Sequence, residues 1–217
     1  MKKHLKRENI PKTWPIPKKG TKYVIKPNFN LKQGVPLLIV LRDMLRVVKN
    51  RRELKKAIYE KKVLINTKPA RDEKDSIQLF DKISLVPSKK FYKLNLTDKG
   101  KYTLEEINEK DSNQKISKII NKKILKKKKI QINLLDGRNF ISDISCNTGD
   151  SVTINFKEKK LEKCWPLKEN AKVIIFAGKH SGKRGKIIKL KPERKMASID
   201  TKKEKINALI KQIMVID

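Results

Sequence analysis

The sequence contains little cysteine and histidine and no long apolar run, and each shortage excludes a class of site. Among 217 residues there are two cysteines, Cys146 and Cys164, and two histidines, His4 and His180. These spacings give neither a disulfide framework nor paired zinc ligands. No stretch approaches the roughly 18 consecutive apolar residues of a membrane span, and no apolar stretch follows the first seven residues to make a signal peptide. We therefore expect no metal site and no membrane span, and a protein that stays inside the cell.

Acidic residues are also few, which leaves a large positive charge. The chain has 56 Lys and Arg against 23 Asp and Glu, a formal net charge of +33 at pH 7. A chain this far from neutrality repels itself, and phosphate contacts with counterion release would relieve that repulsion. Solubility alone needs far less charge. The composition therefore indicates a nucleic-acid partner.

Hydrophobic residues make up 37% of the chain and fall in periodic clusters, which predicts small folded cores joined by basic segments. We expect an α+β, multidomain chain. The predicted parts are a basic N-terminal arm, a small domain of two helices on a sheet, a β-rich central domain and a C-terminal β-barrel, over residues 1–34, 35–87, 88–168 and 169–217 respectively.

The arm combines basic residues with proline and glycine, a composition that gives neither helix nor strand period and favours disorder without RNA. Its aromatic residues Trp14, Tyr23 and Phe29 have two equal interpretations: they stack on bases, or they pin the arm to the body. The candidate RNA contacts of the arm are Lys2, Lys3, Lys6, Arg7, Lys12 and Trp14.

Residues 37–58 have the clearest helical pattern. A 3.6-residue period of apolar residues from Leu37 to Val48 predicts one amphipathic helix, with Arg42, Arg46 and Lys49 together on another face. Asn50, with a glutamate three residues on, is typical of an N-cap that begins a second helix. The second helix has apolar Leu54, Ala57 and Ile58 and a basic face of Arg51, Arg52, Lys55 and Lys56. Short strands are expected over 63–65 and 77–86, with a turn after the first.

This region resembles the S-four-type RNA-binding domain over about residues 36–86. The motif L-R-D-M-L…K-N-R-R-E-L-K-K-A-I…K-V-L-I-N, followed by D-K-I-S-L, carries the resemblance. It implies RNA contact by the basic residues of both helices, Arg42, Arg46, Arg51, Arg52, Lys55 and Lys56, to which we add Lys49 and Lys62. One departure is the turn Asn66-Thr67, where that family often has Asn-Gly.

The central region is less regular. Apolar alternation predicts strands near residues 91–96, 130–134 and 153–156, with Gly100 and Asp136-Gly137 as turns. The stretch 103–124 is expected to be helical, because Thr103-Leu104-Glu105-Glu106 resembles a helix start. The run of four lysines at 126–129 is expected to lie against phosphate.

Near the C-terminus a strand-like run, residues 171–177, precedes G-K-H-S-G-K-R-G-K-I-I. This segment resembles the KOW motif, which implies a small SH3-like β-barrel with a Gly-rich loop that approaches RNA or a protein partner. Glycines at 178, 182 and 185 would permit positive φ and close approach. The pattern matches neither a phosphate-binding loop nor a dinucleotide fingerprint. The candidate loop residues are Gly178, Gly182 and Gly185, with Lys179, His180, Ser181, Lys183, Arg184 and Lys186 as RNA contacts.

The order of these parts resembles, over essentially the whole chain, the S-four-e family of archaeal and eukaryotic small-subunit ribosomal proteins. Local agreement includes H-L-K-R at the start and F-A-G-K-H-S-G-K-R-G near residue 180. The resemblance implies a structural constituent of the ribosome in the cytoplasm, taking part in translation. Its expected partners are small-subunit ribosomal RNA and neighbouring ribosomal proteins, with no small-molecule substrate, self-association, cofactor or catalysis.

Two other functions compete. S-four-type domains also serve pseudouridine synthases and some methyltransferases, but those enzymes need a catalytic domain larger than the roughly 80 central residues. A transcription factor with a KOW barrel would explain neither the S-four-type domain nor the charge on every segment.

Overall fold

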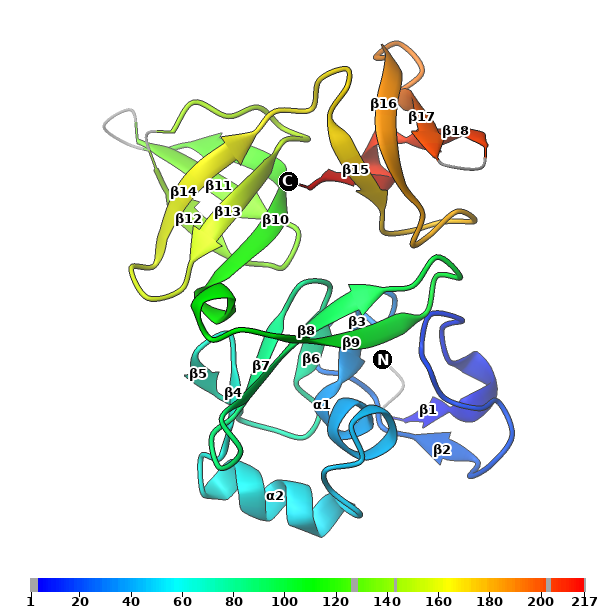
Figure 1. The fold of residues 1–217 in the computed structure, drawn as a ribbon, viewed down its shortest axis with the longest axis vertical. Coiled ribbons are helices and arrows are strands. Elements are labelled where there is room, and N and C mark those ends of the chain that lie inside the picture. Colours follow the sequence, from blue (N-terminus) through cyan, green and yellow to red (C-terminus); the bar gives the residue numbers. More distant parts are fainter. Residues whose placement is uncertain (1–3, 126–128, 143, 202–203, 217) are drawn as a thin grey trace. The chain divides into compact units, whose positions relative to one another are not determined.

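The structure, a computed structural model, describes residues 4–125, 129–142, 144–201 and 204–216. The chain folds into two compact units. The first unit holds the described residues up to 96 together with 101–113, and the second holds 97–100 together with the described residues from 114 onward. Strands dominate both units and helices are few (Figure 1). The expectation of a multidomain chain with much β-structure is therefore confirmed.

The first unit is built on a five-stranded antiparallel sheet with the order β5-β4-β7-β8-β9. Its strands are β4 (Val63–Ile65), β5 (Lys68–Pro69), β7 (Lys82–Leu85), β8 (Lys90–Leu96) and β9 (Tyr102–Ile107). Two small sheets pair β1 (Leu5–Lys6) with β2 (Tyr23–Val24), and β3 (Gly34–Pro36) with β6 (Ser76–Gln78). The unit also contains the 3-10 turns η1 (Arg7–Asn9) and η3 (Lys110–Asn113).

The sheet of the first unit extends further along the chain than expected. The residues of strands β8 and β9 belong to the central region of the sequence prediction, which begins at residue 88. In the structure β8 pairs with β7, and β9 pairs with β8. The strand expected near residues 91–96 is confirmed as β8, but it completes the sheet behind the helices.

The first helix is shorter than its apolar pattern predicted. Helix α1 (Leu37–Ile39) continues as the π-helical turn η2 (Val40–Met44). Arg46 then takes a left-handed φ of 56°, and the amide of Val47 donates to the carbonyl of Leu41 at 2.9 Å. Val48 is buried, but it reaches the core from a turned loop. The prediction of one helix through Val48 was therefore wrong, because burial at a helical spacing does not require helical backbone.

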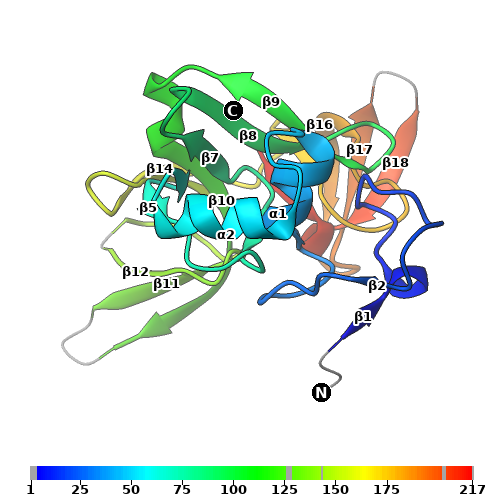
Figure 2. The ribbon, with the colours of Figure 1, turned by 90° about the horizontal axis from the view of Figure 1, so that it is seen from below.

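The second helix is confirmed as α2 (Arg51–Tyr59), with the expected cap. Asn50 Oδ1 accepts from the Glu53 amide at 3.0 Å, and the Glu53 carboxylate accepts from the Lys49 amide at 2.6 Å. These bonds satisfy amides that the first helical turn leaves without partners. Leu54 is fully buried beneath the helix. Figures 1 and 2 both show α2 next to α1.

The turn after β4 is a two-residue hairpin that joins it to β5. Asn66 and Thr67 both have positive φ, 49° and 68°, as a primed turn requires. Asn66 is buried, its Nδ2 donates to the Asp81 carboxylate at 2.7 Å, and its Oδ1 accepts from the Lys82 amide at 2.9 Å. Asn66 is thus fixed by the fold, whereas the β-branched Thr67 occupies a conformation that suits glycine better.

The helix expected over residues 103–124 is not formed. This stretch contains β9, η3 and the long strand β10 (Gln114–Ile124). In the register of β8 with β9, Leu94 lies opposite Leu104 and Lys93 opposite Glu105. Cross-strand pairing with β8 therefore outweighs the local resemblance to a helix start.

The second unit contains two five-stranded antiparallel sheets. The first has the order β12-β11-β10-β13-β14, with β11 (Ile130–Leu134), β12 (Asn139–Ile141), β13 (Ser151–Asn155) and β14 (Lys160–Trp165). The second has the order β18-β17-β16-β15-β19 and ends the chain. Its strands are β15 (Lys172–Ile175), β16 (Arg184–Lys191), β17 (Met196–Thr201), β18 (Lys205–Leu209) and β19 (Ile213–Val215), with the 3-10 turn η5 (Ile210–Gln212) before β19.

Strands expected at 130–134 and 153–156 are confirmed as β11 and β13. Strand β10 serves two neighbours: its residues 114–118 pair with β13, and its residues 119–124 pair with β11. Each sheet has its own buried cluster, around Ile119, Ile132 and Ile154 in one and around Val173, Ile187 and Ile199 in the other.

A buried lysine ties β10 to the C-terminal segment. Lys118 is 5% exposed, and its Nζ donates to the carbonyl of Ile210 and, at 2.7 Å, to that of Ile213. Burial lowers the pKa of Lys118 to about 8. Ser151 adds a second tie, since its hydroxyl accepts from the Val215 amide at 3.0 Å. Two lysines of this acid-poor chain, Lys118 and the buried Lys115, therefore serve the fold.

Candidate nucleic-acid interface

Helix α2 presents several basic side chains on one exposed face, as the sequence predicted. Arg52, Lys55 and Lys56 are all exposed, on the side away from buried Leu54. Lys56 lies 4.0 Å from Glu60, a weak exposed ion pair that phosphate can displace. We refer to Arg52, Lys55 and Lys56 as the α2 basic face.

Arg51, at the beginning of α2, has another role. Its guanidinium forms a fork on Glu73: Nε lies 2.6 Å from both carboxylate oxygens and Nη2 bonds Oε1. Glu73 is 1% exposed, and its backbone carbonyl accepts from the Leu38 amide at 3.1 Å. The hydrogen bond to Glu73 raises the pKa of Arg51, against a smaller opposing effect of burial. Arg51 therefore fastens α2 to the segment before β6, a contact that no local sequence pattern indicated.

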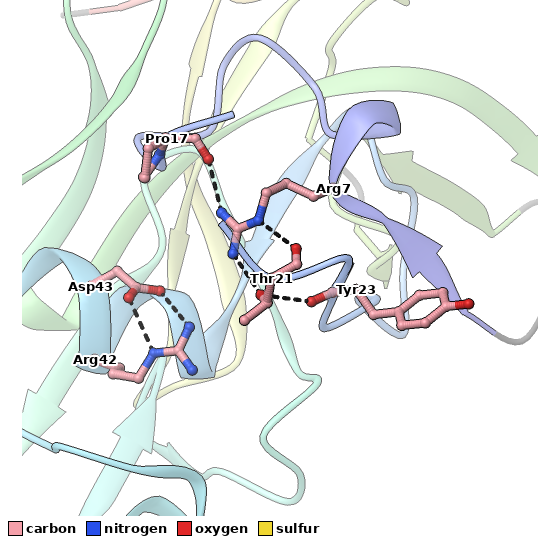
Figure 3. A network of polar contacts seen from close by, with 6 residues as sticks. All are labelled: Arg7, Pro17, Thr21, Tyr23, Arg42 and Asp43. Atoms are coloured by element: carbon pink, nitrogen blue, oxygen red, sulfur yellow. Dashed lines mark hydrogen bonds and ion pairs between the residues drawn. The ribbon is translucent and has the colours of Figure 1, made fainter. Parts of the chain in front are cut away.

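The basic residues expected on the first helix do not share a face. Arg42 forms a fork on the adjacent Asp43, with Nε 3.1 Å from Oδ1 and Nη2 2.9 Å from Oδ2 (Figure 3). Arg46 and Lys49 are exposed in the loop that precedes α2. Lys62 lies 2.5 Å from Glu60, and this contact lowers the pKa of Glu60.

The arm contains more structure than its composition indicated. Arg7 holds it in a loop, because Nε donates to the carbonyl of Thr21 at 2.7 Å, Nη2 to the Thr21 hydroxyl at 2.8 Å, and Nη1 to the carbonyl of Pro17 at 2.8 Å (Figure 3). Trp14 is 2% exposed, and its Nε1 donates to the Gly34 carbonyl at 2.9 Å. Of the two interpretations of Trp14, the structure therefore favours the one in which its side chain holds the arm against the body of the first unit.

Other arm residues remain accessible. Lys6 and Lys12 are exposed, and so are the aromatic rings of Tyr23 and Phe29. Lys6 lies 3.7 Å from Glu8, an exposed and weak pair. Lys2 and Lys3 lie outside the described residues, as do residues 126–128 of the lysine run.

The glycines of the C-terminal loop are required by packing within the chain. Gly182 has a φ of +93°, and a Cβ added there would lie 1.9 Å from the carbonyl oxygen of Thr97. A Cβ on Gly185 would lie 2.1 Å from the carbonyl oxygen of Asp200 in β17. Ser181 is also buried, and its hydroxyl donates to the carbonyl of Phe176 at 3.2 Å. Gly182 and Gly185 therefore have packing reasons within the chain, and the approach of this loop to RNA stays a prediction.

The cations of the same loop differ in availability. Lys179, Arg184 and Lys186 are exposed, whereas His180 is half-buried. Lys183 pairs with Glu204, and that pair lowers the pKa of Glu204. Strand pairing sets Lys172 of β15 opposite Lys186 of β16, a cross-strand pair of like charges that an anion would stabilise.

The described residues show neither a membrane-crossing helix nor a metal-binding cluster. None of their helices is long and apolar enough to cross a membrane. Nowhere among them do three or more His, Cys, Asp and Glu side chains gather as metal ligands would.

Comparisons with known proteins agree on one family. The model described as Ribosomal family S4e matches residues 88–161, and the RS4NT domain model matches residues 1–29. The chain is 38% identical over 197 residues to the small ribosomal subunit protein eS4 of Methanocella arvoryzae, covering 89% of this chain and 83% of that protein. It is 35% identical to the eS4 protein of Methanospirillum hungatei, with 85% and 79% covered.

A solved structure shares the fold. The crystal structure of the 30S ribosomal protein S4e from Thermoplasma acidophilum superposes with a TM-score of 0.72 at 24% sequence identity, covering 85% of this chain and 95% of that one.

Proposed function

The chain belongs to the S4e family of ribosomal proteins, and from this membership we propose that it is a structural constituent of the small ribosomal subunit that binds ribosomal RNA and takes part in translation. The observation that carries the proposal is the match over most of the chain to proteins named as small-subunit eS4. The net charge of +33 supplies the electrostatic reason for an RNA partner.

We assign the RNA contacts to the cations that the fold leaves available. These are the α2 basic face, Lys6 and Lys12 of the arm, Arg46 and Lys49 of the loop before α2, and Lys179, Arg184 and Lys186 near the C-terminus. In this proposal the helices with the sheet behind them act as the S-four-type module, and the sheet β18-β17-β16-β15-β19 acts as the KOW barrel. Phosphate contacts of this kind position a protein on folded RNA more than they read its sequence.

The proposal assigns no catalysis, cofactor or small-molecule substrate, and it names neighbouring ribosomal proteins as further partners. The RNA-modifying enzyme is not favoured, since the curated relatives are named as ribosomal proteins. Asp136 also has a structural role in its turn, which argues against a catalytic one. Its carboxylate pairs with buried Lys115 at 3.1 Å and accepts a hydrogen bond from the Arg138 amide.

Sedimentation of a cell lysate at moderate salt tests the ribosomal assignment. The protein should travel with the small-subunit peak and dissociate as salt rises. Absence from that peak would contradict the proposal.

Charge reversal tests the interface. The triple variant Arg52→Glu, Lys55→Glu and Lys56→Glu should weaken binding to small-subunit ribosomal RNA and reduce the log-log salt slope by about 0.7 to 0.9 per lost phosphate contact. The matched control reverses three exposed lysines around the β13–β14 hairpin, Lys157, Lys160 and Lys163, with the same change in net charge. Equal losses in both variants would exclude the α2 basic face as a specific contact.

A further inference from the structure

A cleft in the first unit combines aromatic and cationic walls. Its volume is about 650 Å³, within the range of pockets that take small organic ligands. The arm contributes His4 and the segment 23–28, and the helical region with the turn before β6 contributes Leu38, Arg42, Arg51 and Lys74. The sequence prediction identified the two arginines but neither Lys74 nor the cleft.

The cationic lining of the cleft is oriented before any ligand arrives. Arg42 and Arg51 each direct Nε and Nη2 to a carboxylate, Asp43 and Glu73 respectively. A guanidinium has five N–H donors, so each fork leaves Nη1 for a further acceptor. Lys26 and Lys74 also line the cleft, and the described residues that line it include no Asp or Glu. This lining is suited to a phosphate group.

The aromatic lining is exposed but held in place. The Tyr23 ring is 51% exposed, and the His4 ring meets it edge-on with centroids 5.3 Å apart. Pairing of β1 with β2 sets Leu5 opposite Val24, and the Asn28 amide donates to the Lys74 carbonyl at 3.0 Å. In Figure 3 the Tyr23 ring extends away from the Arg42–Asp43 pair, which separates the aromatic lining from the cationic one.

We propose that this cleft receives one unpaired nucleotide of RNA, with its base stacked on Tyr23 and its phosphate held by Arg42, Arg51 and Lys74. The inference rests on the proposed RNA-binding function and adds the chemical class of ligand for one place on the surface. A nucleotide suits both linings, because it carries a flat base and a phosphate a few bonds apart, whereas a simple anion would leave the aromatic lining unused.

The test compares three RNA hairpins that differ at one position. The first has a single bulged 2-aminopurine nucleotide, the second has an abasic bulge, and the third is fully paired. Full-length protein should bind the first about tenfold more tightly than the second, since stacking one base on an aromatic ring contributes an effect of that order. The 2-aminopurine fluorescence should fall on binding, because stacking quenches it.

Matched variants locate the effect. Tyr23→Ala should abolish the tenfold preference and the fluorescence change. Tyr59→Ala should preserve both, because Tyr59 is 88% exposed on α2 and is not a lining residue. Lys74→Gln should weaken both bulged hairpins equally and lower the salt slope by about one phosphate contact.

The outcomes separate this inference from the proposed function. Equal affinity for all three hairpins, or a preference that survives Tyr23→Ala, would overturn the nucleotide site alone. If no hairpin is bound with a steep salt dependence, the proposed RNA-binding function fails and the cleft assignment fails with it.

Discussion

Arg51 and Arg52 are neighbours on α2, and we expect only the substitution of Arg51 to lower stability. Arg51→Gln removes the partner of Glu73, a carboxylate that is 1% exposed. Loss of one member of a fully buried ion pair costs about 3 to 5 kcal/mol. The side chain of Arg51 is 57% exposed, so water reaches the vacated site and the expected loss falls to about 2 kcal/mol. For a unit of this size, that loss lowers the melting temperature by roughly 6 to 12 °C.

The two tryptophans offer a way to observe the first unit by itself. Trp14 is buried in the first unit and Trp165 lies in the second. In a Trp165→Phe background, the fluorescence of Trp14 reports the unfolding of the first unit during heating. Arg52→Gln should leave this transition in place but weaken RNA binding several-fold, because Arg52 is exposed and serves only the proposed interface.

Glu73→Gln provides the control. Added to Arg51→Gln, it removes the uncompensated charge and should recover part of the lost stability, a coupling that a double-mutant cycle measures. An unchanged melting temperature in Arg51→Gln would refute the structural role of this pair.

Three further predictions concern strain, packing and pH. Thr67→Gly should raise the free energy of unfolding by roughly 0.5 to 1 kcal/mol in urea titrations, because it relieves a β-branched residue at a φ of 68°. Gly182→Ala should lower it by roughly 2 to 4 kcal/mol, since the added Cβ meets the Thr97 carbonyl. Gly178→Ala should cost about half as much, because a movable side chain faces it. Between pH 7 and pH 9 Lys118 should raise the stability by about 1 kcal/mol, because its folded pKa of about 8 lies below its unfolded value and the unfolded chain therefore binds more protons. Burial lowers the pKa of Lys82 in the first unit to about 8 as well, so Lys118→Met should remove the contribution of Lys118 and leave that of Lys82.

Local signals in the sequence sufficed where local contacts decide the structure. Helix α2 was predicted with its cap because Asn50 and Glu53 bond to amides that are at most four residues away in the sequence. Strands such as β11 were found because their alternation reflects one buried face. The helix predicted at residues 103–107 was wrong because a long-range contact decides the structure there. Glu105 pairs across the sheet with Lys93, which lies twelve residues earlier on β8.

Long-range contacts also explain which structural roles of the candidate site residues the sequence did not show. The composition around Glu73, R-D-E-K-D, is that of a surface turn, and nothing in it marks one carboxylate as buried beneath Arg51. Arg7 likewise looks like any basic residue of an arm until the chain folds back to bring Thr21 to it. The sequence prediction gave both arginines a role in RNA binding alone, because charge is visible in a sequence and a partner 14 or 22 residues away is not.

In this chain, which has few acidic residues, three buried charged groups hold parts of the fold together. Glu73 fastens α2, Asp136 holds Lys115, and the carbonyls of η5 and β19 hold Lys118. The chain keeps a net charge of +33, and the α2 basic face, the arm and the C-terminal loop each expose part of this charge at the surface. The folded chain therefore retains a repulsion that phosphate can relieve, so that binding RNA and stabilising the fold are linked through the same surface cations.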